Sequence, residues 1–259
     1  MKDSRRGVSR KTMDYFGKTF LSNSCGYYQI IMANSTDRMK AIFLQTNTEI
    51  TVNANQVDCG SVVDPYYPTL CNVGFHGKAE SVADDSGKQL KEYVYWYGML
   101  ARCYGKRELA AYKDCIVSEE FHDFSYFQKW FHEQIGRYEK DFQLDKDILS
   151  PDCKIYAEDT CVLVPSEINL FFVKTNNKKL HGNYPIGVTY DNVYKRFTAV
   201  YGGCGGESHV SYHNNEWSAL LAYKRAKESR ARELAEKWRG RIDDRVYDKL
   251  LTYKVLLTD

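Results

Sequence analysis

Hydrophobic positions in the first third of the chain come in short runs separated by turn-forming residues. Alternation of this kind is typical of antiparallel strands. The apolar runs cover residues 27–33, 39–44 and 49–52. Glycines and prolines then interrupt short extended pieces up to residue 80. We therefore predict a small, strongly bent β-barrel over residues 26–80, preceded by a basic arm over residues 1–25.

The middle of the chain changes to helical spacing and then back to extended pieces. Apolar side chains recur every three or four positions in residues 93–104 and 121–135, which predicts two helices. Short extended pieces follow residue 141, and Pro165-Ser166-Glu167 opens a short helix. A domain over residues 91–180 is predicted, with the order helix, helix, strand, strand, short helix.

The C-terminal part, residues 183–259, has the pattern of a small sheet covered by a helix. Three strands are predicted over residues 186–190, 196–201 and 208–212. A long amphipathic helix over residues 216–237 and a short one near residues 243–253 follow. One helix is enough to bury a single apolar face of such a sheet. The predicted fold class is therefore α+β.

Composition and charge narrow the class of protein only a little. The 259 residues include 36 Lys and Arg against 34 Asp and Glu, a net charge of +2, which does not decide for or against nucleic acid. No apolar run is long enough for a transmembrane helix, and no apolar stretch follows the N-terminal charges, so we expect a cytoplasmic protein without a membrane partner. The eight cysteines form no CxxC pair, so we expect reduced thiols, and whether any of them binds zinc stays open.

Several catalytic motifs are missing from the sequence. It has no GxSxG elbow, no HExxH helix and no GxxxxGK[ST] phosphate loop. His122 and His132 are ten residues apart, which is not the spacing of two metal ligands on one helix.

The stretch FQLDKDILSPDCKIYAEDTCVLVPSEINLFF, residues 142–172, resembles the ββα-metal core of HNH nucleases. The resemblance places Asp145 at the acidic position, Lys146 at the general-base histidine and Asn169 at the last helical position. It implies a catalytic set of Asp145, Lys146, Asp147 and Asn169, and a site for one divalent cation, Mg²⁺ or Mn²⁺, at Asp145, Asp147 and Asn169. A protonated lysine is no base unless it is buried, so we expect a degenerate centre with little or no cleavage.

The C-terminal part, with YPIGV, YKRFTA and the long helix after them, resembles the APETALA-two type of DNA-binding domain. That family lays a three-stranded sheet in the major groove, where basic and amide side chains contact phosphates and bases. Residues 224–245 contain nine basic and five acidic side chains, which suits either a phosphate track or a solvated helix face. The DNA-binding residues implied are Tyr190, Lys195, Arg196, Tyr201, His209, Tyr212, Lys224 and Arg225.

Over residues 26–259 the combination of blocks is similar to a phage family that contains HNH and APETALA-two domains. The marks are GSVVDPYYPTLCNVGFHG, YWYGMLARCY, LDKDIL and KIYAEDTCVLVPSEIN. The resemblance implies a phage-encoded, homing-endonuclease-like protein that binds duplex DNA in the cytoplasm of the bacterial host. Two alternatives stay open: an interaction protein that inhibits a host defence or transcription factor, and an active metal-dependent endonuclease.

Overall fold

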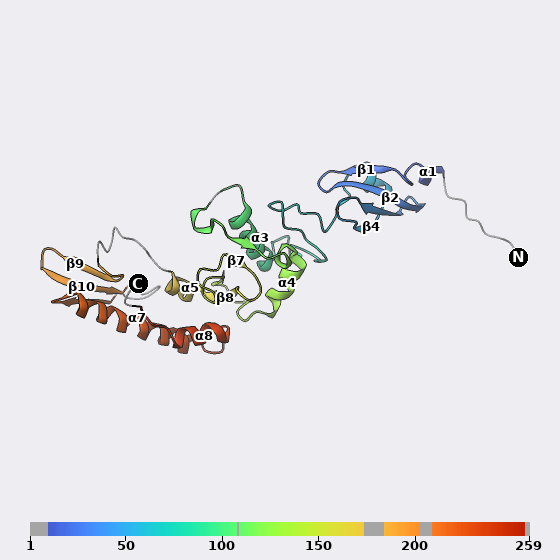
Figure 1. Cartoon of the computed structure of the whole chain (residues 1–259). Helices are drawn as coiled ribbons and strands as arrows, with labels where there is room; N and C mark the ends of the chain where they lie inside the picture. Colours follow the sequence, from blue (N-terminus) through green and yellow to red (C-terminus); the bar gives the residue numbers. More distant parts are fainter. Residues whose placement is uncertain (1–9, 108, 174–183, 202–208, 257–259) are drawn as a thin grey trace. The chain divides into compact units, whose positions relative to one another are not determined.

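The computed structural model describes residues 10–107, 109–173, 184–201 and 209–256 (Figure 1). It is an α+β structure, as the sequence predicts. The chain forms two compact units, Met1–Trp130 and Phe131–Asp259, which we call the N-terminal and C-terminal units. Their boundary falls inside the segment 91–180, and the division into four parts stays a prediction.

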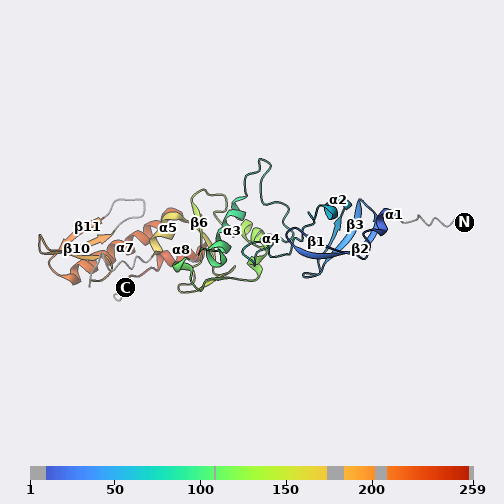
Figure 2. The ribbon, with the colours of Figure 1, turned by 90° about the horizontal axis from the view of Figure 1, so that it is seen from above.

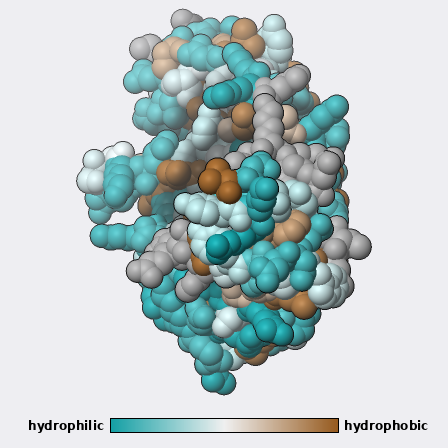
Figure 3. Space-filling model, turned by 90° about the vertical axis from the view of Figure 1, so that its left-hand side faces the viewer, coloured by the Kyte–Doolittle hydropathy of each residue, from teal (hydrophilic) through white to brown (hydrophobic). Residues whose placement is uncertain are grey.

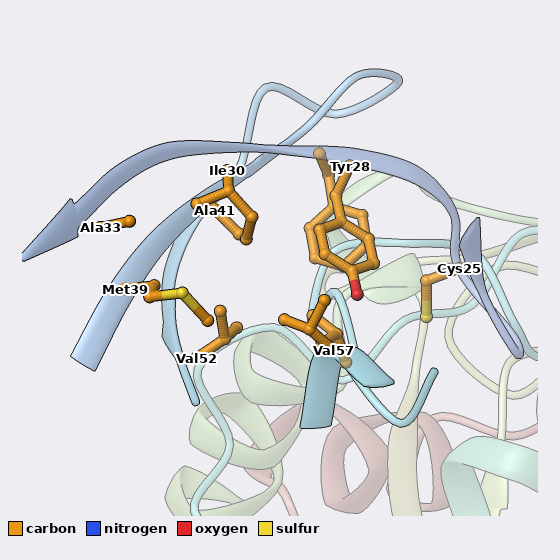
Figure 4. Close-up of a cluster of buried hydrophobic side chains, with 10 residues drawn as sticks. Cys25, Tyr28, Ile30, Ala33, Met39, Ala41, Val52 and Val57 are labelled. Atoms are coloured by element: carbon orange, nitrogen blue, oxygen red, sulfur yellow. The ribbon is translucent and has the colours of Figure 1, made fainter. Parts of the chain in front are cut away.

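The N-terminal unit begins with helix α1 (Arg10–Met13) and an antiparallel sheet in the order β1-β2-β3-β4. Alternating residues of β2 and β3, such as Tyr28, Ile30 and Phe43, are fully buried on one face of the sheet. Val57 of the short helix α2 packs into the same cluster (Figure 4). The element bounds are β1 Thr19–Ser22, β2 Gly26–Ser35, β3 Arg38–Phe43, β4 Glu49–Val52 and α2 Ala54–Asp58.

This sheet corrects the predicted barrel. Within residues 10–107 the four strands form an open sheet, with β1 and β4 at its edges. Closure would need every strand to have two neighbours, and four short strands here leave two edges. The buried face is covered by α2 and by Val62 instead. Strand β1 also lies in the predicted arm, so residues 19–22 belong to the sheet.

The rest of the N-terminal unit packs helices around aromatic side chains. Trp96 of α3 is fully buried and donates a hydrogen bond to the carbonyl oxygen of Phe121, 2.7 Å away. Its ring centroid lies 5.1 Å from that of Phe124. The elements are α3 Lys91–Tyr104, η1 Ala110–Tyr112, β5 Ile116–Val117, η2 Glu120–His122 and α4 Phe124–Glu133, the last of which crosses the boundary between the units.

The C-terminal unit contains a ββα segment and a sheet on a helix. Strands β6 (Phe142–Asp145) and β8 (Val162–Pro165) pair antiparallel, and α5 (Ser166–Phe172) follows β8 directly. The later strands form a three-stranded antiparallel sheet in the order β11-β10-β9, with α7 packed along one face, as the alternation predicts (Figures 1 and 2). The remaining bounds are β7 Ile155–Tyr156, β9 Val188–Asp191, β10 Arg196–Tyr201, β11 His209–His213, α7 Glu216–Trp238 and α8 Asp244–Leu251.

None of the helices in the described segments combines the length and the apolar content that a membrane crossing requires.

Candidate functional site

The ββα segment places Asp145 at the end of β6, where the strand turns into a loop. The register of β6 and β8 sets Asp145 opposite Val162, which is fully buried. The carboxylate accepts hydrogen bonds from the backbone N–H groups of Asp147, at 2.8 Å, and Ile148, at 2.7 Å. Burial raises the pKa of Asp145, the charge of Asp147 raises it further, and the two backbone hydrogen bonds oppose that rise. The carboxylate therefore caps the turn after β6.

Lys146, the residue that the resemblance places at the general-base position, is buried, with 4% of its surface exposed. Its ammonium group donates a hydrogen bond to the carbonyl oxygen of Cys153 at 2.9 Å and pairs with the carboxylate of Asp147. The nitrogen lies 5.6 Å from the centroid of the Tyr156 ring. The nitrogen is therefore engaged inside the loop by a carboxylate, a carbonyl oxygen and a ring face.

Asn169, on α5, points its amide at β6. Its Nδ2 donates a hydrogen bond to Oε1 of Gln143, 2.6 Å away. Gln143 and Asp145 are two positions apart on β6 and so share one face of that strand. Asn169 is thus near the predicted site, but its polar partner is an amide.

Each of the three side chains predicted to hold a divalent cation, Asp145, Asp147 and Asn169, contacts another group of the chain. Both backbone hydrogen bonds to Asp145 end on Oδ1, and a cation at Asp147 would have to displace the Lys146 ammonium. Within the described segments, no group of three or more His, Cys, Asp or Glu side chains comes close enough to hold a metal ion. Asp145 therefore caps the turn after β6, and Lys146 and Asp147 crosslink the loop. Asn169 contacts β6 through Gln143.

Glu167, at the start of α5, is a central residue that the sequence did not single out. Its carboxylate accepts hydrogen bonds from Lys237 at 2.5 Å, from the indole of Trp238 at 2.6 Å and from Arg230 at 3.3 Å. Burial alone would raise the pKa of Glu167, but the hydrogen bonds from Lys237 and Trp238 bring it below the usual value. The only local signal was an acid in the first turn of a predicted helix, which the helix dipole explains equally well.

The C-terminal sheet has two different faces, which the strand register defines. One face carries Val188, Phe197, Ala199 and Tyr201, which pack in the hydrophobic cluster with α7. The face turned away from α7 carries the residues that alternate with these along the strands. They are Thr189, Arg196, Thr198, Val210 and Tyr212, of which Thr198 is buried.

The predicted DNA-binding residues on the strands divide between these faces. Tyr190 lies on the covered face, with its ring centroid 5.0 Å from that of Phe197, and Tyr201 lies there too, 6.3 Å from Tyr223. Arg196 and Tyr212 are on the open face, where Tyr212 is 58% exposed.

Two further predicted positions lie at the ends of strands. Lys195 is exposed in the turn between β9 and β10, with a left-handed φ of 50°. His209 begins β11 opposite Tyr201, and its side chain lies outside the described part of the chain.

Most basic side chains of α7 and the loop after it are bound inside the C-terminal unit. Lys224 pairs with Glu228 at 2.7 Å and donates to the carbonyl oxygen of Val255 at 2.6 Å. Arg225, by contrast, is exposed. The other bound cations are Arg230 and Lys237 with Glu167, Arg239 with Glu236, Arg241 with Glu139, and Arg245 with Asp243. Six of the nine basic side chains of segment 224–245 thus form ion pairs within the unit, and four of these six are at least half exposed.

Arg225 also lies in a different layer from Arg196 and Tyr212. Tyr223 packs toward the sheet, and a residue two positions later is about 200° further round the helix. Arg225 therefore points away from the sheet, whereas Arg196 and Tyr212 lie on the opposite side of the two-layer structure. A duplex docked on the open sheet face does not reach Arg225.

The surface in Figure 3 is mostly hydrophilic, with hydrophobic residues in small separate groups. Comparisons of this chain with protein-family models, with curated proteins and with solved structures each found no match.

Proposed function

We propose that the chain binds duplex DNA through the face of the C-terminal sheet turned away from α7. The observation that carries this proposal is that α7 packs on one face only of the sheet, while the other presents exposed Arg196 and Tyr212, with Lys195 at the adjoining turn. A narrow antiparallel ribbon fits the major groove, and guanidinium and ammonium groups offset phosphate charge. The resemblance to the APETALA-two type of domain supports the same face.

In this proposal the ββα segment supports the sheet and does not cut DNA. Its element order and the resemblance suit descent from an HNH homing endonuclease of a phage, acting in the bacterial host. The buried ammonium of Lys146 stands where that family needs a neutral base. Glu167 binds this segment to α7, the helix that carries the sheet.

A salt series of DNA-binding measurements tests the proposal, with the opposite layer as its control. Each lost phosphate contact lowers the slope of log K against log salt by about one unit. We expect this decrease in slope for Arg196→Ala and for Lys195→Ala. Tyr212→Ala should lower the affinity by a smaller factor and leave the slope unchanged. Arg225→Ala, an exposed arginine in the other layer, should leave affinity and slope unchanged. Salt-independent binding by the natural chain, or equal losses for Arg196→Ala and Arg225→Ala, would contradict the proposal.

A second candidate is an interaction protein that binds a host defence or transcription factor. It is favoured by exposed apolar and aromatic side chains on and beside the same face: Tyr194 is 67% exposed, Tyr212 58% and Val210 49%. Aromatic side chains are enriched in protein interfaces. The same salt series separates the two candidates, because an aromatic protein interface lacks the steep salt dependence of phosphate contacts.

A further inference from the structure

The segment after α8 is held against α5 and α7 by side chains. Tyr253 and Val255 both belong to or pack against the hydrophobic cluster of the C-terminal sheet. The side chains that hold this segment come from two helices, and we call them the tail site. They are Phe171, Phe172, Tyr223, Lys224, Lys227 and Glu228.

Both polar backbone groups of Val255 are bound by one ion pair of α7. The N–H of Val255 donates to Oε1 of Glu228 at 3.1 Å, and its carbonyl oxygen accepts from Nζ of Lys224 at 2.6 Å. Lys224 and Glu228 are four positions apart and pair with each other at 2.7 Å. One turn of helix thus satisfies both backbone polar groups of one residue, as a neighbouring strand would in a sheet.

Two side chains of the segment serve as anchors. Val255 is 4% exposed and lies in the cluster with Val188 and Ala199. The ring centroid of Tyr253 is 4.9 Å from that of Phe171, and the Lys227 ammonium lies 5.6 Å from each of these two centroids.

Between the two anchors, Lys254 points outward. Its side chain is 64% exposed, and its nitrogen is 3.7 Å from Oε2 of Glu228. Tyr253 and Val255 on either side of it are half-buried and buried, so both enter the site while Lys254 faces solvent.

We propose that the tail site is a peptide-binding site for an aromatic–basic–aliphatic segment, occupied by the chain's own Tyr253–Val255 as a releasable latch. The latch is held by side chains, so it opens without breaking the helical hydrogen bonds of α7 or the ladder of the sheet. Local openings of this kind need less free energy than global unfolding. While closed, the latch ties α5 to the sheet and to α7 through one short segment.

Hydrogen exchange on the full chain tests the latch directly. We expect the Val255 amide to exchange by local opening, faster than the amides of Ala231 and Leu234, which are buried in α7. Glu228→Gln should speed exchange at Val255 at least about tenfold, because the backbone N–H loses a charged acceptor. Glu233→Gln is the matched control, since Glu233 is an acid of the same helix with a 57% exposed side chain. The latch is ruled out if the Val255 amide exchanges only together with the α7 amides in the natural chain, in Glu228→Gln and in Glu233→Gln.

A peptide in trans gives a second measurement that does not need Glu228→Gln to fold. The probe is a fluorescent peptide with the sequence of residues 251–256, LTYKVL. It should bind saturably to a full chain carrying Val255→Asp, and at least about tenfold more weakly to the natural chain, whose own tail competes at high effective concentration. A peptide with Asp in place of Val255 should not bind. No saturable binding to the Val255→Asp chain, with its circular dichroism unchanged, would overturn the peptide-binding site.

Discussion

Lys146 donates a hydrogen bond to the backbone carbonyl oxygen of Cys153, 2.9 Å away, and so closes the loop that follows β6. The same ammonium pairs with Asp147 and lies over the ring of Tyr156. It is an internal crosslink at the position that the sequence resemblance assigns to the base of an HNH nuclease.

We expect little or no divalent-metal-dependent cleavage of plain duplex DNA. General-base assistance contributes about 100- to 10,000-fold to such reactions. The nitrogen of Lys146 is engaged by Cys153 and Asp147 and is not placed to take a proton from water. Supercoiled plasmid incubated with the protein and Mg²⁺ or Mn²⁺ should stay intact. Nicking that disappears in Asp145→Ala would show instead that the chain is an active endonuclease with an unusual base.

Lys146→Ala should destabilise the C-terminal unit by about 1–3 kcal/mol, because it leaves a carboxylate and a carbonyl without their donor. Lys154→Ala, a change at an exposed lysine in the same loop region, should stay within about 0.5 kcal/mol. Denaturant unfolding with a probe in this unit, such as the fluorescence of Trp238, measures both. Equal effects of the two substitutions would refute the crosslink.

Glu167→Gln should lower the stability of the C-terminal unit by about 1–3 kcal/mol, since three donors lose a charged acceptor at an 18% exposed side chain. Glu233→Gln removes the other partner of Arg230, at a 57% exposed side chain, and should cost about 0–1 kcal/mol. The pKa of Glu167 is lowered on folding, so its contribution is present above pH 4.5 and is lost as the pH falls through the lower folded pKa. Chemical denaturation at pH 7 and at pH 3.5 should therefore show a smaller difference between Glu167→Gln and the natural chain at the lower pH.

The N-terminal unit should lose stability as the pH falls below 6.5. Burial lowers the pKa of His76 and of His122, and the nearby Glu119 and Glu120 only partly oppose this at His122. The unfolded chain then binds protons that the folded chain does not, from the ordinary histidine pKa of 6.5 down to the lower folded values.

Thermal unfolding of the N-terminal unit at pH 7.5 and 5.5 measures this effect. His76→Gln and His122→Gln should each flatten the pH dependence, whereas His213→Gln, in the other unit, should not. An unfolding temperature that is higher at pH 5.5 than at pH 7.5 would contradict this prediction.

Gly187→Ala should be much more damaging than Gly240→Ala. Both glycines have left-handed φ angles, 80° and 70°, so each alanine is strained by about 1 kcal/mol. A Cβ on Gly187 would also lie 2.2 Å from the ring of Tyr223, whereas one on Gly240 would meet nothing within 4 Å. Overpacking adds about 1–3 kcal/mol at Gly187, and the difference between the two variants in urea unfolding checks the close approach of β9 to α7.

The sequence alone determined the elements of the C-terminal unit and their order. Alternation along β10 and the helical spacing of α7 are local patterns with periods of 2 and 3.6, so they can be recognised in a short window. The same alternation shows that Tyr201 and Arg196 point to opposite faces of β10. It does not show which face α7 covers, because that depends on how Tyr223 and Leu220 pack against the strands.

Tertiary structure decided the roles of the charged residues. The sequence shows a lysine at position 146 but not that it is buried, and it shows Glu167 only as an acid at the start of a helix. Lys237, which donates to Glu167, is 70 residues further along the chain. Local periodicity holds no information about such a pair, because the contact exists only after α5 and α7 have packed together. Whether β1 and β4 pair and close a barrel is likewise decided by tertiary structure. It depends on the bend of the whole sheet and on the side chains that pack against its concave face.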